Sequence, residues 1–192
     1  FAVTKVADTE SVERAREDFG FFCDYVANKP PAAHHQDWHR HFVTNQDSVC
    51  LKSIAGPNID LLGPRGSAKS TVLGLFTAWA IGIHTMAKMP LQILYLSYTV
   101  EIARPKSAAI KRIIESRRYQ EVFPKVRLLK NVTSNEYWSI DHKFAGIEAV
   151  GDEMFTLCAA GLKGSVTSKR SHLVIIDDCI KSASDISNPD IR

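Results

Sequence analysis

The hydrophobic and polar positions along this chain follow two alternating patterns, which together predict an α/β fold. Three continuous apolar runs are typical of buried strands in a parallel sheet, and they span 59–62, 91–97 and 172–178. Residues 69–86 are apolar on most faces of a helix, and another helix with Pro105 in its first turn runs to about Tyr119. Strands that alternate with helices in this way favour a mostly parallel central sheet flanked by helices.

The first 45 residues contain two helical patterns. Apolar residues recur at helical spacing over 9–28, and a second short helix is expected over 33–42. Pro30 and Pro31 end the first pattern, because proline cannot continue a helix. We expect the helices of residues 1–45 to pack on the sheet.

A small β-hairpin insertion is predicted before the last strand. Short strand patterns lie at 136–140, 144–150 and 154–159, and Gly151-Asp152 is a typical hairpin turn between the last two.

Length and composition suit one ordinary globular domain over residues 1–192. Apolar residues make up 45% of the chain and charged residues 23%, which is enough for a single core. The net charge of +3 implies no field that would bind polyanions over the whole surface. The cysteines are widely spaced, which fits a reducing compartment, and no apolar run is long enough to span a membrane. Because the chain begins at Phe1 rather than Met, we expect it to be one domain of a longer protein.

A phosphate-binding loop is predicted directly after the first strand. The chain there reads Gly63-Pro64-Arg65-Gly66-Ser67-Ala68-Lys69-Ser70-Thr71. This is close to the pattern G-x-x-x-x-G-K-[ST], in which backbone N–H groups and a helix N-terminus hold phosphate oxygens. Lys69 would reach the β- and γ-phosphates, and Ser70 would bind Mg²⁺. Ala68 replaces the second glycine of the pattern, and its methyl group is tolerated only if the local φ is negative.

Two carboxylates close the last apolar run, at the sheet edge where open α/β folds bind their ligands. Asp177 is expected to hold Mg²⁺ directly or through water, and Asp178 to orient or deprotonate an attacking water. A solvated acidic turn is the structural alternative for this pair. Together with the loop, the two carboxylates predict binding of ATP or another nucleoside triphosphate.

Two further polar features have both a functional and a structural interpretation. The amide of Gln36 both donates and accepts, so it is a candidate for the adenine edge, and otherwise it is a glutamine on a helix surface. Arg104, Lys111 and Arg118 are seven residues apart and share a stripe. The stripe is either a solvated helix face or a contact to DNA or to a neighbouring subunit.

The long interval between Lys69 and Asp177 favours the helicase-like or translocase-like branch of the P-loop NTPases. Enzymes of that branch have an extra strand between the two strands that carry the motifs. Asp178, directly after the Mg²⁺-site carboxylate, indicates activation of water rather than transfer of phosphate to an organic acceptor.

Five motifs, in this order and spacing, resemble those of a known family. They are Gly-Pro-Arg-Gly-x-x-Lys-Ser-Thr at 63–71, Leu-Ser-Tyr-Thr at 96–99, the segment 113–124 ending in Val-Phe-Pro, a Gly-rich basic loop at 161–170, and Ile-Ile-Asp-Asp at 175–178. From Gln36 onward the chain resembles the ATPase domain of the phage large terminase subunit, the motor that packages viral DNA. Many members have Asp-Glu where this chain has Asp177-Asp178, and the family's usual glycine stands where this chain has Ala68.

The resemblance implies a motor that uses ATP and Mg²⁺. Arg65 in cis and Arg170 in trans would stabilise the charge that develops on the γ-phosphate, with Lys169 and Arg104 as other candidates for the trans role. Hydrolysis would change the contacts in a homo-oligomeric ring and so move double-stranded DNA into a procapsid. The implied partners are the portal protein and the small terminase subunit, and the implied location is the cytoplasm of an infected bacterial host.

The family's nuclease domain would lie beyond Arg192, so we expect no nuclease activity from these residues. The alternative function is a DNA-stimulated helicase-like ATPase, which shares the same motifs. A small-molecule kinase would instead act without DNA, and a nucleotide-binding module would not hydrolyse at all.

Overall fold

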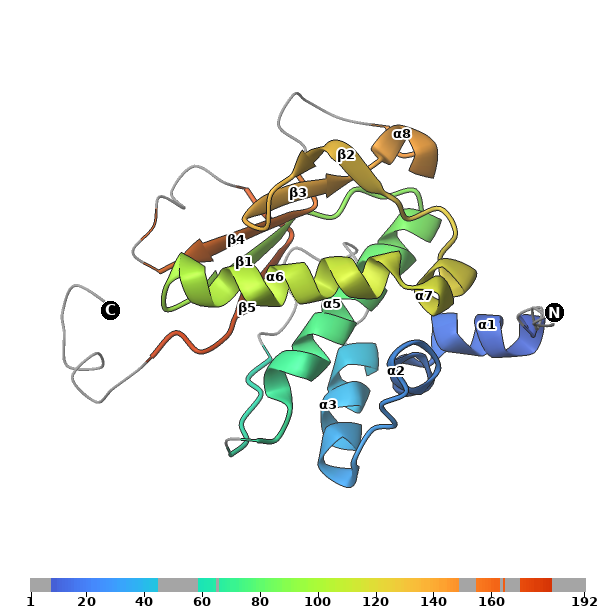
Figure 1. Cartoon of the computed structure of the whole chain (residues 1–192). Helices are drawn as coiled ribbons and strands as arrows, with labels where there is room; N and C mark the ends of the chain where they lie inside the picture. Colours follow the sequence, from blue (N-terminus) through green and yellow to red (C-terminus); the bar gives the residue numbers. More distant parts are fainter. Residues whose placement is uncertain are drawn as a thin grey trace, which may run out of the picture.

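A five-stranded mixed sheet forms the centre of the molecule in the computed structural model (Figure 1). The structure describes residues 8–44, 59–64, 66–148, 155–162, 164 and 170–180. The strand order is β2-β3-β4-β1-β5. The strands are β1 (Ile93–Ser97), β2 (Leu128–Thr133), β3 (Tyr137–Ile140), β4 (Leu157–Gly161) and β5 (Leu173–Ile176).

The sheet is parallel on one side and antiparallel on the other. β1 pairs in parallel with β4 and β5, whereas β3 pairs antiparallel with β2 and β4. The α/β class is therefore confirmed, and the sheet is mixed rather than purely parallel, because β3 runs opposite to the other strands described. The tight turn at Ser134, whose hydroxyl accepts the N–H groups of Glu136 and Tyr137, forces β2 and β3 to run in opposite directions.

The hairpin lies earlier in the chain than predicted. It joins β2 to β3, and β2 has no counterpart among the predicted strands. The strand predicted at 144–150 is wrong, because α8 (His142–Ala145) begins there, with the Asp141 side chain accepting from the Phe144 N–H. Gly146 ends this helix at φ 73°. The predicted turn at Gly151-Asp152 lies outside the described residues.

Alternate residues of the parallel strands face opposite sides of the sheet. Ile93, Tyr95 and Ile175 belong to the main core, on the side that the helices cover. On the other side Val174 is 48% exposed and Ile176 64% exposed. The strand predicted at 172–178 is thus confirmed, but within the described residues only one of its faces is buried.

The helices form two layers on that covered face (Figure 1). α5 (Lys69–Met86) and α6 (Val100–Glu115) lie nearest the sheet, followed by α7 (Arg117–Val122). α1 (Thr9–Glu17), α2 (Phe19–Ala27) and α3 (Ala33–Thr44) form the outer layer. α2 packs on α5 and α7 and α1 packs on α7, so the N-terminal helices rest on other helices rather than on the sheet.

Two predicted helices are each divided by a capping residue. Asp18 has an extended backbone and its side chain accepts from the Phe21 N–H, which ends α1 and starts α2. Ser116 does the same between α6 and α7, accepting from the Tyr119 N–H. α6 begins at Val100, so Pro105 lies inside the helix and not in its first turn.

Close packing joins the two helical layers. The Trp79 indole of α5 donates to the Ala15 carbonyl of α1 at 3.2 Å. A Cβ on Gly82 would lie 2.4 Å from the Phe123 ring, so only glycine allows this approach. In the part of the chain that is described, no helix combines the length and apolarity needed to cross a bilayer.

Residues 59–62 are not a strand, contrary to the prediction. Ile59 and Leu61 contact the core through their side chains, whereas Leu62 is 85% exposed. The segment is therefore anchored by side-chain packing and not by strand pairing. The predicted extra strand between the two motif strands stays a prediction.

Candidate functional site

The loop before α5 has an unusual backbone at the position of the missing glycine. Ala68 is the N-cap of α5 and has φ 60° and ψ 23°, the left-handed region. Gly66 also has a positive φ, of 83°. The condition under which the methyl group would be tolerated, a negative φ, is therefore not met, and alanine occupies a conformation that favours glycine. Since alanine has no side-chain acceptor, the first N–H groups of α5 stay available to an anion.

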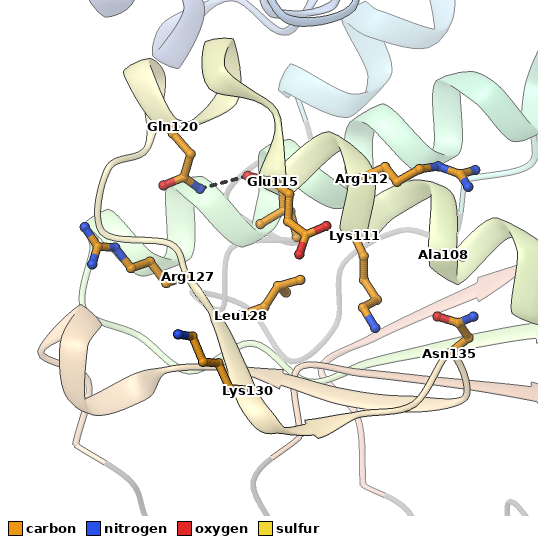
Figure 2. A pocket seen from close by; sticks show the side chains of 10 residues that line it. Ala108, Lys111, Arg112, Glu115, Gln120, Arg127, Leu128, Lys130 and Asn135 are labelled. Atoms are coloured by element: carbon orange, nitrogen blue, oxygen red, sulfur yellow. Dashed lines mark hydrogen bonds between the residues drawn. The ribbon is translucent and has the colours of Figure 1, made fainter.

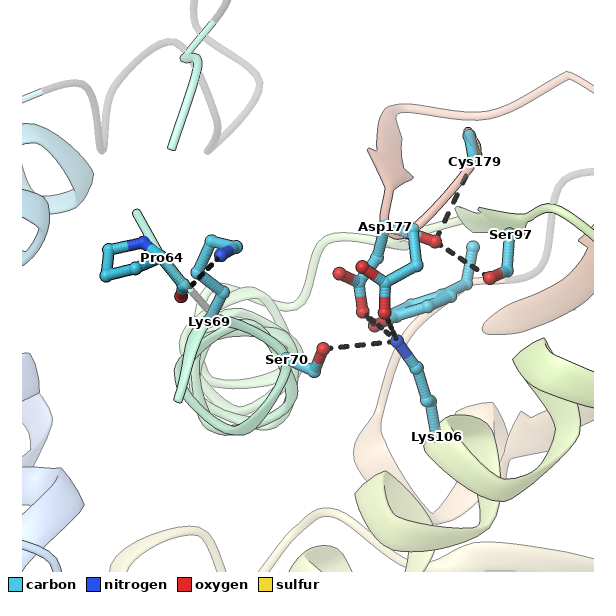
Figure 3. A network of polar contacts seen from close by, with 9 residues as sticks. Pro64, Lys69, Ser70, Ser97, Lys106, Asp177 and Cys179 are labelled. Carbon is cyan, nitrogen blue, oxygen red and sulfur yellow. Dashed lines mark hydrogen bonds and ion pairs between the residues drawn. The ribbon is translucent and has the colours of Figure 1, made fainter. Parts of the chain in front are cut away.

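The Lys69 side chain folds back over this loop. Its ammonium donates to the Gly63 carbonyl at 2.5 Å and to the Pro64 carbonyl at 3.2 Å, and the Pro64 contact is drawn in Figure 3. A Cβ on Gly63 would meet the Ser67 hydroxyl at 2.8 Å, so a larger residue there would displace that hydroxyl. The loop is thus closed around its own lysine.

Helix α3 contacts the same loop through histidines. His35 Nε2 lies 2.9 Å from the Ser67 carbonyl oxygen, and His34 Nε2 lies 3.4 Å from it. The neighbouring Gln36 is exposed on α3, and Thr71 is exposed on α5. Gln36 is thus next in sequence to His35, which contacts the loop. Its predicted role toward adenine stays a prediction.

Asp177 and Asp178 follow directly after β5 but have different surroundings. Asp177 is 5% exposed, and its carboxylate accepts the Tyr95 hydroxyl at 2.8 Å. The Ser97 hydroxyl donates to the Asp177 backbone carbonyl at 2.8 Å. Asp178 is 65% exposed and has φ 54°. The first carboxylate is therefore held in place, and the second faces solvent.

Lys106 of α6 joins the loop helix to both carboxylates (Figure 3). Its ammonium lies 2.5 Å from Asp177 Oδ2 and 3.0 Å from Asp178 Oδ2. It also donates to the Ser70 hydroxyl at 3.1 Å. Ser70, Asp177 and Asp178, far apart in sequence, are thus brought to a single point, as the sequence predicts for a metal–nucleotide site.

The charges at this point shift the ionisation of the groups around it. Burial alone would raise the pKa of Asp177, but hydrogen bonds from Lys106, Tyr95 and Ser70 hold the pKa below its ordinary value. Partial burial would lower the pKa of Lys106, but the two carboxylates outweigh it and raise the pKa. Burial and then the Asp177 charge raise the pKa of Tyr95 far above its ordinary range. These directions favour a charged Asp177 carboxylate, a charged Lys106 ammonium and a neutral Tyr95 phenol.

The oxygens gathered here fit Mg²⁺. They are one hydroxyl and two carboxylates, hard donors that already surround a positive charge. Within the described residues, no group of three or more His, Cys, Asp or Glu side chains is arranged to hold a metal ion. A site with so few protein ligands suits Mg²⁺, which keeps waters and takes substrate phosphates as further ligands.

Of the predicted arginines, Arg104 and Arg170 are described, and both have other surroundings. Arg65 and Lys169 lie outside the described residues, and Arg170 is exposed before β5. Arg104 is paired with Glu136, with Nε 2.6 Å from the carboxylate. The cis and trans roles assigned to Arg65 and Arg170 therefore stay predictions.

The predicted basic stripe is broken up by the fold. Arg118 lies on α7 and donates to the Tyr25 carbonyl at 2.7 Å, so it does not continue the face of α6. Lys111 instead lines a hollow of about 680 Å³ between α6, α7 and β2 (Figure 2). Three further cations line it with one carboxylate, Glu115, and these cations are Arg112, Arg127 and Lys130.

Sequence reasoning missed Lys106 and Tyr95 as members of the site. Tyr95 lies in the strand predicted at 91–97. A phenol among aliphatic residues in a buried strand indicates a buried hydrogen bond. Lys106 follows Pro105 in a helix with many cations, and nothing in the sequence separates it from the others.

No model of a known protein family matches this chain, and no curated protein matches it.

Proposed function

We propose that this chain is a Mg²⁺-dependent ATPase of the terminase type, which hydrolyses ATP to move double-stranded DNA. The observation that carries the proposal is the convergence of Ser70, at the start of α5, with Asp177 and Asp178, at the end of β5. Open α/β sheets bind ligands at that edge, and a nucleotide needs an anion site and a metal site side by side. The motif order that resembles terminases supports the choice among P-loop enzymes.

In this proposal each residue has one task. Lys69 leaves the carbonyls of Gly63 and Pro64 and binds the β- and γ-phosphates, while the N–H groups that start α5 hold phosphate oxygens. Ser70 and Asp177 would hold Mg²⁺, which when bound neutralises phosphate charge and orients the γ-phosphate. Gln36 would contact adenine.

The exposed carboxylate acts on water. Asp178 is open to solvent, so it accepts a hydrogen bond from a water molecule and aims it at the γ-phosphate. Arg65 and Arg170 would stabilise the charge that develops on the phosphate, and an arginine in this role accelerates hydrolysis by roughly 10³-fold or more.

DNA, the ring and the packaging partners enter the proposal through the resemblance. The cations around the hollow beside α6 are suited to phosphate contacts with duplex DNA. A homo-oligomeric ring that works with a portal protein and a small terminase subunit would act in the cytoplasm of an infected bacterium. A DNA-stimulated helicase-like ATPase has the same site and is the second candidate.

The test is the ATPase rate of the wild type and of Lys69→Ala, measured against protein concentration with and without duplex DNA. Lys69→Ala should abolish hydrolysis, because it removes the ammonium that this proposal assigns to the β- and γ-phosphates. Lys29→Ala, which removes an exposed lysine between α2 and α3, should leave the rate unchanged.

The outcomes separate the candidates. A wild-type rate per subunit that rises steeply with concentration supports a ring, whereas a flat rate that DNA stimulates supports a helicase-like monomer. Unchanged turnover in Lys69→Ala would refute the phosphate-loop assignment.

A further inference from the structure

The Lys106 ammonium occupies the point at which the predicted metal ligands meet. It has three N–H donors, and three oxygens lie within hydrogen-bond distance of it, at 2.5, 3.0 and 3.1 Å. These oxygens belong to Asp177, Asp178 and Ser70. Every donor of the ammonium is thus used on a group assigned to the metal or to the attacking water.

An ordinary salt bridge does not require this arrangement. The Lys106 side chain is only 19% exposed, so its charge is withdrawn from most of the solvent. The contact to Ser70 ties it to the first turn of α5 as well as to β5. A divalent ion bound to the same oxygens would lie directly beside the ammonium, and two positive charges so close together repel strongly. The lysine and the metal therefore exclude each other.

We infer that Lys106 holds the metal position in the nucleotide-free protein, so that free divalent cations are excluded and the metal enters only together with nucleotide. This inference rests on the proposed function. The phosphates of the nucleotide supply the negative charge that draws the flexible lysine stem away from the carboxylates. Lys106 is then a positioning residue that makes the metal and nucleotide bind as one unit.

The experiment measures Mn²⁺ binding without nucleotide, from the electron paramagnetic resonance signal of free Mn²⁺. Lys106→Met removes the charge with a side chain of similar length, and Lys106→Gln removes it but keeps an amide that can donate to Asp177. Both variants should bind Mn²⁺ at least about tenfold more tightly than wild type, a change of ~1.4 kcal/mol. Lys29→Gln removes the charge of an exposed lysine between α2 and α3, outside the site, and should bind Mn²⁺ as wild type does.

Two measurements on wild-type protein complete the test. In a mixture of protein and a non-hydrolysable ATP analogue, more Mn²⁺ should be bound than the sum of what the protein alone and the analogue alone bind at the same concentrations. Mn²⁺ binding as tight without the analogue as with it would overturn the inference, even if neither Lys106 variant folds. Folded variants with the wild-type Mn²⁺ affinity would overturn it as well.

The inference and the proposed function fail in different ways. If wild type binds the analogue but the Lys106 variants gain no Mn²⁺ affinity, the inference fails and the ATPase proposal stands. If wild type does not bind the analogue, the ATPase proposal fails, and the nucleotide-linked entry of the metal fails with it. A gain of Mn²⁺ affinity in the variants would then still support Lys106 as the occupant of the metal position.

Discussion

Ala68→Gly should stabilise the folded protein, although glycine usually loses more conformational entropy on folding than alanine does. Ala68 has φ 60°, where the Cβ of an L-residue crowds the following carbonyl oxygen. The side chain is exposed, so removing its methyl group sacrifices little packing. The substitution therefore isolates the backbone strain of the phosphate loop.

The magnitude follows from two opposing terms. The left-handed conformation costs a residue with a Cβ roughly 1–2 kcal/mol, which glycine does not incur. Glycine loses more conformational freedom on folding, which costs roughly 0.5–1 kcal/mol. The expected net gain is about 0.5–1 kcal/mol in the free energy of unfolding. For a chain of this size it corresponds to a rise in Tm of roughly 1–4 °C.

Ala87→Gly is the matched control, measured in the same urea and thermal unfolding experiments. Ala87 is also exposed and caps the other end of α5, but its φ is −73°. Glycine relieves no strain there, so only the entropic loss of roughly 0.5–1 kcal/mol remains and the protein should be destabilised. The two alanines should thus shift stability in opposite directions. A loss for Ala68→Gly equal to that for Ala87→Gly would refute the left-handed loop.

Two further predictions concern the carboxylates. Asp178→Asn keeps a residue that tolerates φ 54°, so it should bind Mg²⁺ and ATP analogue as wild type does but hydrolyse at least ~10²-fold more slowly; loss of binding would instead make Asp178 a metal ligand. The folded-state pKa of Asp177 is below its ordinary 3.8, so its stabilising contribution is complete above that pH and is lost as the pH falls through the folded value. The difference in unfolding free energy between wild type and Asp177→Asn should therefore be constant well above pH 3.8 and shrink as the pH is lowered below it in urea titrations. A difference that stays constant below pH 3.8 would contradict the pairing.

The elements that the sequence predicts well are those with a strong local pattern. The runs around Tyr95 and Ile175 form β1 and β5, because both are short, rich in Ile, Leu and Val or Tyr, and bounded by polar residues, which is typical of a strand. The helix of 69–86 is also confirmed with its bounds, as α5. The start of α5 and the two carboxylates meet as expected, although only the carboxylates follow the end of a parallel strand.

The wrong predictions concern places where a side chain competes for backbone N–H groups, or where a contact distant in sequence determines the structure. Asp18 and Ser116 offer their side chains to backbone N–H groups, and this divides helices that the apolar periodicity continues through. β2 contains Lys130 among its apolar residues and depends on pairing with β3, which no local pattern reveals. Ala68 has a positive φ although alanine favours a negative one, so its conformation can be known only from the structure.

The division of roles between the two carboxylates depends on where β5 stops. The Asp177 N–H still donates to the Leu96 carbonyl at 2.9 Å, so this residue continues the ladder with β1 and its side chain points to the Tyr95 hydroxyl. At Asp178 the backbone turns into the left-handed region, and the carboxylate reaches solvent. Two adjacent and chemically identical residues thereby have different surroundings. Both accept from Lys106, but Asp177 is buried against Tyr95 whereas Asp178 is open to water. A longer side chain at 178 would not be needed for this task, because the turn itself moves the carboxylate outward. The proposal that Asp177 binds the metal and Asp178 acts on water therefore follows from one backbone turn, which the Asp-Asp sequence alone does not reveal.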